Sequence, residues 1–371
     1  NMWRLSYMEI WQSIFIQKIA HMNDTKLSKA AHNLLIECAR LRQSDTLLIV
    51  REKESLGWYK NDISDFILQC AEEMGIHTSL YEVGSPETNQ DQNFNEKINQ
   101  YSCVIFFARL GDQNRFENKG FSTKRVMSYV RDCESLASIF GTLDYKLNIL
   151  VKDAIDRLIE NSNIIKINCP LGTNLIGKIT QNNSETKEVS VLRFPILVPK
   201  PIDAKPFYGK VVLNNYLTST GSRFYKPNFI KINGEVTIHI EHGRIADIQG
   251  TSEDVNNIEN HYAYVSQKFG IDMHAVHSWH PGIHPGAEDN KFYEHDPDKW
   301  SNTVFGQPKY LHFHTCGNYA PGEICWMIPN HTVLIDDKPL WKDGELMLDD
   351  FEHTKGLMEK HRTLKNVFSS I

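Results

Sequence analysis

The sequence predicts an α/β protein: an N-terminal α/β domain with a mostly parallel sheet, followed by a β-rich α+β C-terminal domain. Helix and strand patterns alternate in the first half, and hairpin patterns replace them in the second. The 371 residues are 41% apolar and 23% charged, as in a soluble globular protein with a substantial buried core. We expect the boundary near residue 162, which gives domains 1–162 and 163–371.

Short apolar runs and helical spacings alternate through the first domain. A helical face over 24–42 precedes an apolar strand run at 45–50, and the helical spacing returns over 63–74. Further strand runs follow at 77–83 and 103–110. Helices between successive strands indicate a parallel sheet. Because neither common glycine-rich phosphate loop is present, we expect a scaffold or substrate-capping domain.

Paired strand patterns with turn signals fill the second domain. Alternating residues flank a Pro-Leu-Gly turn in 163–179, a His-Gly turn divides 235–250, and an Asp-Asp-Lys turn divides 330–344. The proline-bearing stretch 194–206 is typical of a connecting loop. These hairpins predict antiparallel sheet.

The composition limits the partners and the compartment. A net charge of −6 without Lys/Arg runs argues against nucleic acid or a membrane surface, so we expect a small-molecule substrate. No apolar stretch approaches the roughly 18 residues that cross a bilayer. Charged residues within 1–22 predict a helix there instead of a secretory signal. Seven scattered cysteines without a C-x-x-C motif indicate reduced thiols and a cytoplasmic protein.

Histidines are concentrated in the second domain, where eight of the 16 lie between His274 and His331. His312 and His314 are two residues apart in a strand pattern, so both side chains project from the same face. Neutral imidazole is the commonest metal ligand, and two on one face can bind one cation. The pair therefore predicts a metal site. The alternative is one surface histidine beside a hydrogen-bonded core histidine.

The stretch HAVHSWHPGIHPG supplies further candidates. The spacing of His274, His277 and His280 predicts that they end a helix or turn, because the following Pro-Gly pair breaks any helix. His284 is expected in a loop at the surface. One or two of the first three would complete a site with the strand pair, and the choice among them stays open.

Two residues beyond the histidine pair are candidate catalytic groups. Glu323 is a candidate oxygen ligand or general base near a metal-bound water, the alternative being a solvated turn carboxylate. Tyr319 is a candidate proton donor, the alternative being a packed tyrosine with its hydroxyl satisfied. We expect three aromatic residues to wall a substrate pocket: Trp279, Phe313 and Trp326.

Several short motifs occur in the order found in a known group of enzymes. They are Gly172-Thr173-Asn174-Leu175, the hairpin VTIHIEHGRIADIQG, Phe269-Gly270-Ile271, Gly282-Ile283-His284-Pro285 and the LIDDK of 334–338. This layout resembles the aminopeptidase T family of metallopeptidases. In these details it is more similar to their relatives, the 2,5-dihydroxypyridine dioxygenases, which are non-haem iron enzymes. The resemblance implies a metal-dependent homo-oligomer.

The ligands of those enzymes are only partly matched. Where the peptidases have a glutamate and the dioxygenases a histidine, this chain has Ser278, and Cys325-Trp326-Met327 stands in place of their H-x-D motif. His312 and Tyr319 match the next peptidase histidine and the catalytic tyrosine. The resemblance therefore implies either a rebuilt metal site or a lost one.

The local surplus of histidines favours a rebuilt site formed by His312 and His314 with His277 or His280. Three histidines suit a divalent transition metal, Fe(II) in the first place and Zn(II) as an option. Carboxylates for a two-metal site are scarce in this stretch. We therefore expect a non-haem Fe(II) oxygenase acting on a small aromatic or heterocyclic substrate. Two alternatives stay open: a divergent Zn(II) or Co(II) aminopeptidase, and a non-catalytic small-molecule-binding descendant of the fold.

Overall fold

A computed structural model of the protein describes residues 25–88, 93–113, 123–179, 191–221, 223–288 and 293–368. The helix expected within the first 22 residues lies outside these ranges. Within them, no helix combines the length and apolar character that a membrane span requires.

The chain divides into two compact units. The first comprises Asn1–Lys146 with Val189–Pro195, and the second comprises Leu147–Glu188 with Ile196–Ile371. The helix α8 (Tyr145–Glu160) therefore falls almost entirely in the second unit. The boundary expected near residue 162 lies at the other end of this helix.

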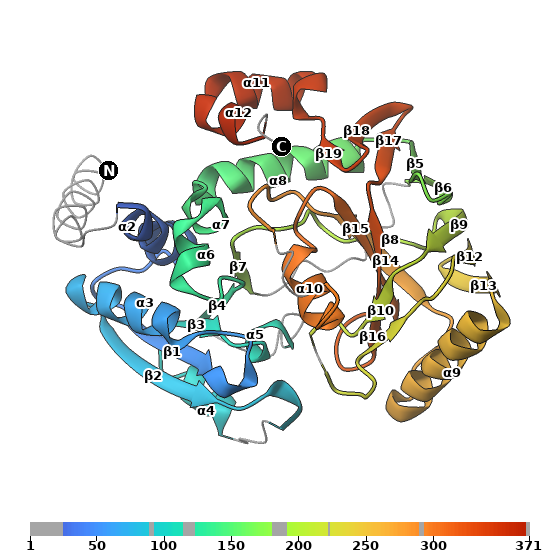
Figure 1. Cartoon of the computed structure of the whole chain (residues 1–371). Coiled ribbons are helices and arrows are strands. Elements are labelled where there is room, and N and C mark those ends of the chain that lie inside the picture. The colour runs from blue at the N-terminus through green and yellow to red at the C-terminus, as the bar shows by residue number, and fades with distance from the viewer. Residues whose placement is uncertain are drawn as a thin grey trace. The chain divides into compact units, whose positions relative to one another are not determined.

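Among its described residues, the first unit contains a five-stranded parallel sheet, sheet A, in the order β2-β1-β3-β4-β7 (Figure 1). Its strands are β1 (Thr46–Glu52), β2 (His77–Val83), β3 (Cys103–Phe107), β4 (Lys124–Ser128) and β7 (Leu192–Phe194). Its longer helices are α2 (Thr25–His32), the π-helix η1 (Asn33–Cys38) and α3 (Asn61–Glu73). Shorter helical segments are η2 (Glu54–Leu56), η3 (Pro86–Thr88), α4 (Phe94–Ile98), α5 (Leu110–Gln113), α6 (Cys133–Ala137) and α7 (Ile139–Thr142). The predicted parallel sheet is confirmed.

The second unit contains two antiparallel sheets. Sheet B has the order β13-β12-β9-β6-β5-β17-β18-β19, and sheet C has the order β11-β10-β16-β15-β14-β8. The strands of sheet B are β5 (Ile164–Asn168), β6 (Asn174–Lys178), β9 (Phe207–Leu213), β12 (Val236–Glu241), β13 (Arg244–Gln249), β17 (Thr332–Ile335), β18 (Lys338–Lys342) and β19 (Glu345–Leu346). Those of sheet C are β8 (Ile202–Asp203), β10 (Tyr216–Thr218), β11 (Phe229–Lys231), β14 (Val276–Pro281), β15 (Tyr310–Cys316) and β16 (Glu323–Pro329).

Besides α8, the helices of this unit are α9 (Ser252–Phe269), α10 (Pro297–Val304), η4 (Leu348–Asp350), α11 (Glu352–Lys360) and α12 (Arg362–Phe368). The predicted hairpins are present as β5–β6, β12–β13 and β17–β18. Two of them turn through paired left-handed residues, His242 and Gly243 at φ 51° and 71°, and Asp336 and Asp337 at φ 47° and 67°. Such pairs match the twist of the flanking strands.

The stretch from residue 274 to 280 differs from its prediction. The spacing of its histidines predicted the end of a helix or a turn. His274 does lie in a turn, but the prediction is wrong for His277 and His280, because residues from Val276 onward form β14, which pairs with β15. The pairing contains a β-bulge at His277, between Val276 and Ser278. Ladder hydrogen bonds to a neighbouring strand therefore outweigh the helical spacing of this short segment.

One face of sheet C packs through large aromatic side chains. Trp279 lies 6.4 Å from Phe313 and 5.2 Å from Phe207 of β9, measured between ring centroids, and Phe313 lies 5.6 Å from Trp326. The indole Nε1 of Trp326 donates to the hydroxyl of Tyr262 on α9 at 2.7 Å. The face is therefore core, held between α9 and β9.

The opposite face of sheet C is covered by α10, the orange helix of Figure 1. Trp300 and Val304 of this helix form a buried cluster with Cys325 and Met327 of β16. The pKa of the Cys325 thiol is raised well above its usual range by burial, with the nearby charge of Glu323 adding to the effect. The thiol is therefore a neutral packing group here.

A buried carboxylate joins α10 to the segment after β10. Asp298 is fully buried and accepts hydrogen bonds from the hydroxyl of Ser219 at 3.0 Å, the amide of Gly221 at 2.8 Å, the guanidinium of Arg223 at 3.1 Å and the amide group of Asn228 at 3.2 Å. Four donors offset part of the loss of water around this carboxylate, and burial still raises the pKa of Asp298 above its usual value. This network fixes the segment against the helix.

Because two histidines are buried, we expect the free energy of unfolding to fall in acid. His284 was predicted at the surface, but like His331 it is fully buried. Burial lowers the pKa values of both histidines to about 3. In the unfolded chain both groups titrate near 6.5, so below that pH the unfolded state binds more protons and the free energy of unfolding falls. By pH 4.5 each histidine removes about 2–3 kcal/mol, since one pKa unit corresponds to about 1.4 kcal/mol.

We expect the His331→Gln variant to lower the slope of unfolding free energy against pH by about one proton between pH 6 and 4. Denaturant unfolding at a series of pH values measures this slope. The exposed His353 offers a control in His353→Gln, which should leave the slope unchanged. Equal slopes in wild type and His331→Gln would contradict the prediction.

Candidate metal centre

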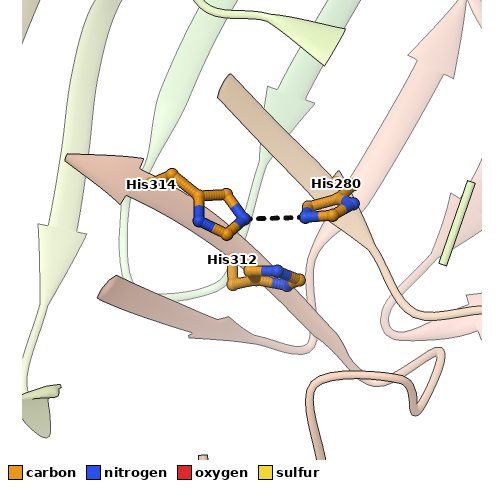
Figure 2. A group of neighbouring side chains, drawn as sticks. All are labelled: His280, His312 and His314. Carbon is orange, nitrogen blue, oxygen red and sulfur yellow. Dashed lines mark hydrogen bonds between the residues drawn. The ribbon is translucent and has the colours of Figure 1, made fainter. Parts of the chain in front are cut away.

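Three histidines from two adjacent strands share one face of sheet C. His280 of β14 lies opposite His312 of β15, and Ser278 lies opposite His314. Because alternate residues of a strand project to the same side, all three rings project from the face that α10 covers. Figure 2 shows the three rings turned toward one another.

The three rings are buried and close together. The Nε2 atoms of His280 and His314 are 2.8 Å apart, and the ring centroids of His280 and His312 are 4.1 Å apart (Figure 2). One nitrogen from each ring belongs to a set whose members all lie within 4.8 Å of one another. No carboxylate or thiol of the described ranges belongs to that set. The cluster is therefore a candidate three-histidine metal centre.

The separation of the rings can be compared with metal geometry. With metal–nitrogen bonds of about 2.1 Å, two ligands at right angles have nitrogens about 3.0 Å apart, and two tetrahedral ligands about 3.4 Å apart. The 2.8 Å between the Nε2 atoms of His280 and His314 is close to the first value. In the absence of a metal, this contact is a hydrogen bond, in which one proton lies between the two Nε2 atoms where an ion would bind. The three-imidazole donor set and the spacing of this pair therefore fit one divalent metal.

A buried carboxylate orients His314. Oε1 of Glu323 contacts Nδ1 of His314, and Oε2 of the same carboxylate accepts a hydrogen bond from the hydroxyl of Thr220 at 2.6 Å. The side chain of Glu323 is buried. A carboxylate that accepts a hydrogen bond from Nδ1–H leaves the lone pair of Nε2 free to bind a metal. Such a carboxylate is a usual outer partner of a metal-bound histidine. Glu323 is thus placed to position a ligand.

His280 faces a backbone carbonyl that is itself held in place. Nδ1 of His280 lies 3.5 Å from the carbonyl oxygen of Pro199. The amide of the same peptide group, on Lys200, donates to Asp156 of α8 at 2.9 Å, and Lys152 pairs with Asp156 at 2.7 Å. A peptide bond is rigid, so fixing its N–H side also fixes its carbonyl. The Pro199 carbonyl therefore has a defined direction relative to His280.

The other predicted site residues lie elsewhere. Nε2 of His277, the residue at the bulge, is 2.8 Å from the carbonyl oxygen of Cys316, so it is not part of the three-histidine group. His274 is exposed, and Tyr319 is 43% exposed in the loop between β15 and β16. Three predicted pocket residues project from the face opposite the histidines: Trp279, Phe313 and Trp326.

Thr220 is a site residue that the sequence analysis did not identify. Its φ of 53° is left-handed, which is a rare conformation for a β-branched residue and costs roughly 1–3 kcal/mol. The local sequence LTSTGS gives no sign that Thr220 has a left-handed backbone conformation. Its hydrogen-bond partner, Glu323, lies more than a hundred residues away in the sequence. Only the folded chain brings these two side chains together.

Comparison with known proteins shows a shared fold. No family model and no curated protein matches the sequence. Among solved structures, the chain has the fold of a group of enzymes that includes a dioxygenase and an aminopeptidase.

One of these structures is 2,5-dihydroxypyridine dioxygenase from Pseudomonas putida KT2440, with a TM-score of 0.61 and 14% identity over 89% of this chain and 98% of that chain. Another is aminopeptidase T, AmpT, from Thermus thermophilus, with a TM-score of 0.54 and 10% identity over 87% of this chain and 99% of that chain. The resemblance predicted from short motifs is confirmed for the fold, while identities this low leave the activity open.

Proposed function

We propose that this protein is a single-metal enzyme that oxidises a small aromatic or heterocyclic substrate with O2. His280, His312 and His314 would hold one divalent transition metal, with Fe(II) favoured and Zn(II) as the other option. The observation that carries the proposal is the convergence of these three imidazoles on one buried face. Bound there, Fe(II) would supply the O2 chemistry that amino-acid side chains lack.

The charge of the site bears on the substrate. Three neutral imidazoles leave the full charge of a divalent ion uncompensated by its ligands, and the nearby Glu323 contributes one negative charge through His314. Such a site favours a substrate with acidic oxygen donors, as a hydroxylated aromatic ring has. We assign Glu323 to holding the Nδ1 proton of His314, in place of the general-base role considered from the sequence.

The alternative of a two-metal aminopeptidase has less support. Two-metal hydrolysis needs carboxylates that bridge a pair of ions about 3.5–4 Å apart. In the described part of the chain, the three-histidine group includes no carboxylate. The fold shared with AmpT keeps this alternative in view as a single-metal variant with Zn(II) or Co(II). A non-catalytic descendant would predict histidines that point apart or hydrogen-bond to the backbone. The convergence of the three rings supports the metal site, since the nitrogen of His280 near a backbone carbonyl is Nδ1 and its Nε2 faces His314.

Three further expectations belong to this proposal. The seven cysteines are all free, which supports a reducing, cytoplasmic compartment. The substrate would be a small molecule. Self-association into a homo-oligomer is expected from the resemblance, and size-exclusion chromatography with light scattering measures it.

Metal analysis tests the proposal directly. We expect protein purified without chelator, or reconstituted anaerobically with Fe(II), to hold about one metal per chain at this single site. Elemental analysis by mass spectrometry measures the ratio. The iron-loaded protein should then consume O2 with a hydroxylated aromatic or N-heterocyclic compound in an electrode assay.

Each rival predicts a different result. Release of amine from aminoacyl-anilides by the Zn(II) or Co(II) form, without O2 uptake by the iron form, would favour the aminopeptidase. Absence of uptake for Fe(II), Zn(II) and Co(II) alike would reject a metal-dependent function and leave the binding protein.

A further inference from the structure

We propose that Thr220 is a positioning residue of the metal centre, which acts on His314 through Glu323. The proposal rests on the proposed metal site, and it assigns a role to a residue in the segment after β10. Two contacts connect these residues: the Thr220 hydroxyl donates to Oε2 of Glu323, and Oε1 of Glu323 contacts Nδ1 of His314.

The first step is the orientation of the carboxylate. The terminal torsion of a glutamate is broad, so a buried carboxylate needs an external contact to fix its plane. The Thr220 hydroxyl lies 2.6 Å from Oε2 of Glu323 and 2.8 Å from the carbonyl oxygen of Ser219. It has one hydrogen to donate, and a bond to an ionised acceptor is the stronger of the two. Glu323 therefore has one oxygen fixed by Thr220 and the other directed at His314.

The second step is the tautomer of His314. With its proton on Nδ1 and shared with Glu323, the ring presents an unprotonated Nε2 toward His280. The reverse tautomer would place a proton on the nitrogen that must bind the metal. By holding the carboxylate, Thr220 therefore keeps Nε2 available as a ligand.

The third step is the strained backbone of Thr220. Its left-handed φ of 53° is maintained by anchors on both sides, since Ser219 and Gly221 both donate to Asp298. The carbonyl of Thr220 itself accepts from Asn302 of α10 at 2.8 Å. A glycine would adopt this conformation without strain. The chain instead keeps a threonine whose hydroxyl reaches into the site, which points to the hydroxyl as the reason.

Three variants distinguish the effect of the Thr220 hydroxyl from the effect of the strained backbone. Thr220→Val removes the hydroxyl and keeps the shape, Thr220→Ser keeps the hydroxyl, and Thr220→Gly removes the hydroxyl while relieving the backbone strain. A matched control is Thr218→Val, because the buried Thr218 hydroxyl contacts Ser301 at 2.8 Å and lies on the same face of sheet C.

Two measurements read the effect. Zn(II), a redox-inert probe, is titrated by calorimetry into the metal-free chain. Nitrogen-15 NMR of the imidazoles reports the tautomer of His314, assigned by loss of its signals in His314→Gln. We expect Thr220→Val and Thr220→Gly to lose about 10- to 100-fold in Zn(II) affinity, as outer-shell substitutions typically do. Both should show mixed tautomers, while Thr220→Ser and Thr218→Val keep those of wild type.

The Thr220→Gly variant makes the test decisive. A purely structural Thr220 predicts that Thr220→Gly is more thermostable with unchanged affinity and tautomer, and this result would overturn the proposal. The glycine variant also gives a result if Thr220→Val fails to fold. If wild type takes up no Zn(II) but the tautomer still changes in Thr220→Gly, the positioning role stands and the proposed metal function fails.

Discussion

The His280→Ala and His312→Ala variants are expected to lose metal affinity by more than about 100-fold, beyond the range typical for an outer-shell partner. Each ring supplies one of three nitrogens, and in the described part of the chain no fourth histidine, thiol or carboxylate atom belongs to the set. Calorimetric titration with Zn(II) and elemental analysis after Fe(II) loading both measure the loss. His314→Ala should behave in the same way and also release Glu323 from its contact.

The same stretch of sequence provides matched controls. His277→Ala removes an imidazole three residues before His280, and His274→Ala removes an exposed one, yet neither ring belongs to the three-histidine group. Both variants should bind metal as wild type does. If His277→Ala lost as much affinity as His280→Ala, the assignment of ligands on β14 would be wrong.

The Asp298→Ala variant is expected to lower the free energy of unfolding by about 3–5 kcal/mol, the usual loss when one partner of a buried ionic network is removed. Removal of the Asp298 carboxylate would take a buried partner from the Arg223 guanidinium and the shared acceptor from three other donors. Urea unfolding followed by tryptophan fluorescence measures the change. Because the network anchors the segment that carries Thr220, metal affinity should fall as well.

An exposed ion pair gives the comparison. Asp272 pairs with Arg244 at side chains that are both about half exposed, and exposed pairs contribute no more than about 1 kcal/mol. Asp272→Ala should therefore change stability far less than Asp298→Ala. Similar losses in the two variants would show that Asp298 contributes nothing beyond an ordinary surface charge.

Local patterns were enough to predict most of the regular structure. The apolar run at 45–50 became the buried strand β1, and the turn at His242 and Gly243 lies where the sequence predicted it. These elements are determined by residues close in the chain, such as a left-handed turn pair between two alternating runs. The pairing of His312 with His314 on one face was predictable for the same reason.

Features that depend on distant segments could not be predicted. Nothing near His280 shows that β14 joins a sheet, because its partner strand begins about thirty residues later. The aromatic residues close to the histidines in sequence, such as Trp279 and Phe313, alternate with them and therefore face the core. The contact of Thr220 with Glu323 joins two segments across the sheet.

Because of the bulge at His277, the place of His280 in the ladder does not depend strictly on the number of residues before it. If residue 277 were deleted, Val276 and Ser278 would pair with the consecutive residues Thr315 and His314, and His280 would still face His312. One residue can thus be gained or lost before His280 without changing which side chain joins the three-histidine group. In this chain, the number of residues between the histidines is therefore a weaker guide to the three-histidine group than the partner of each residue across the ladder.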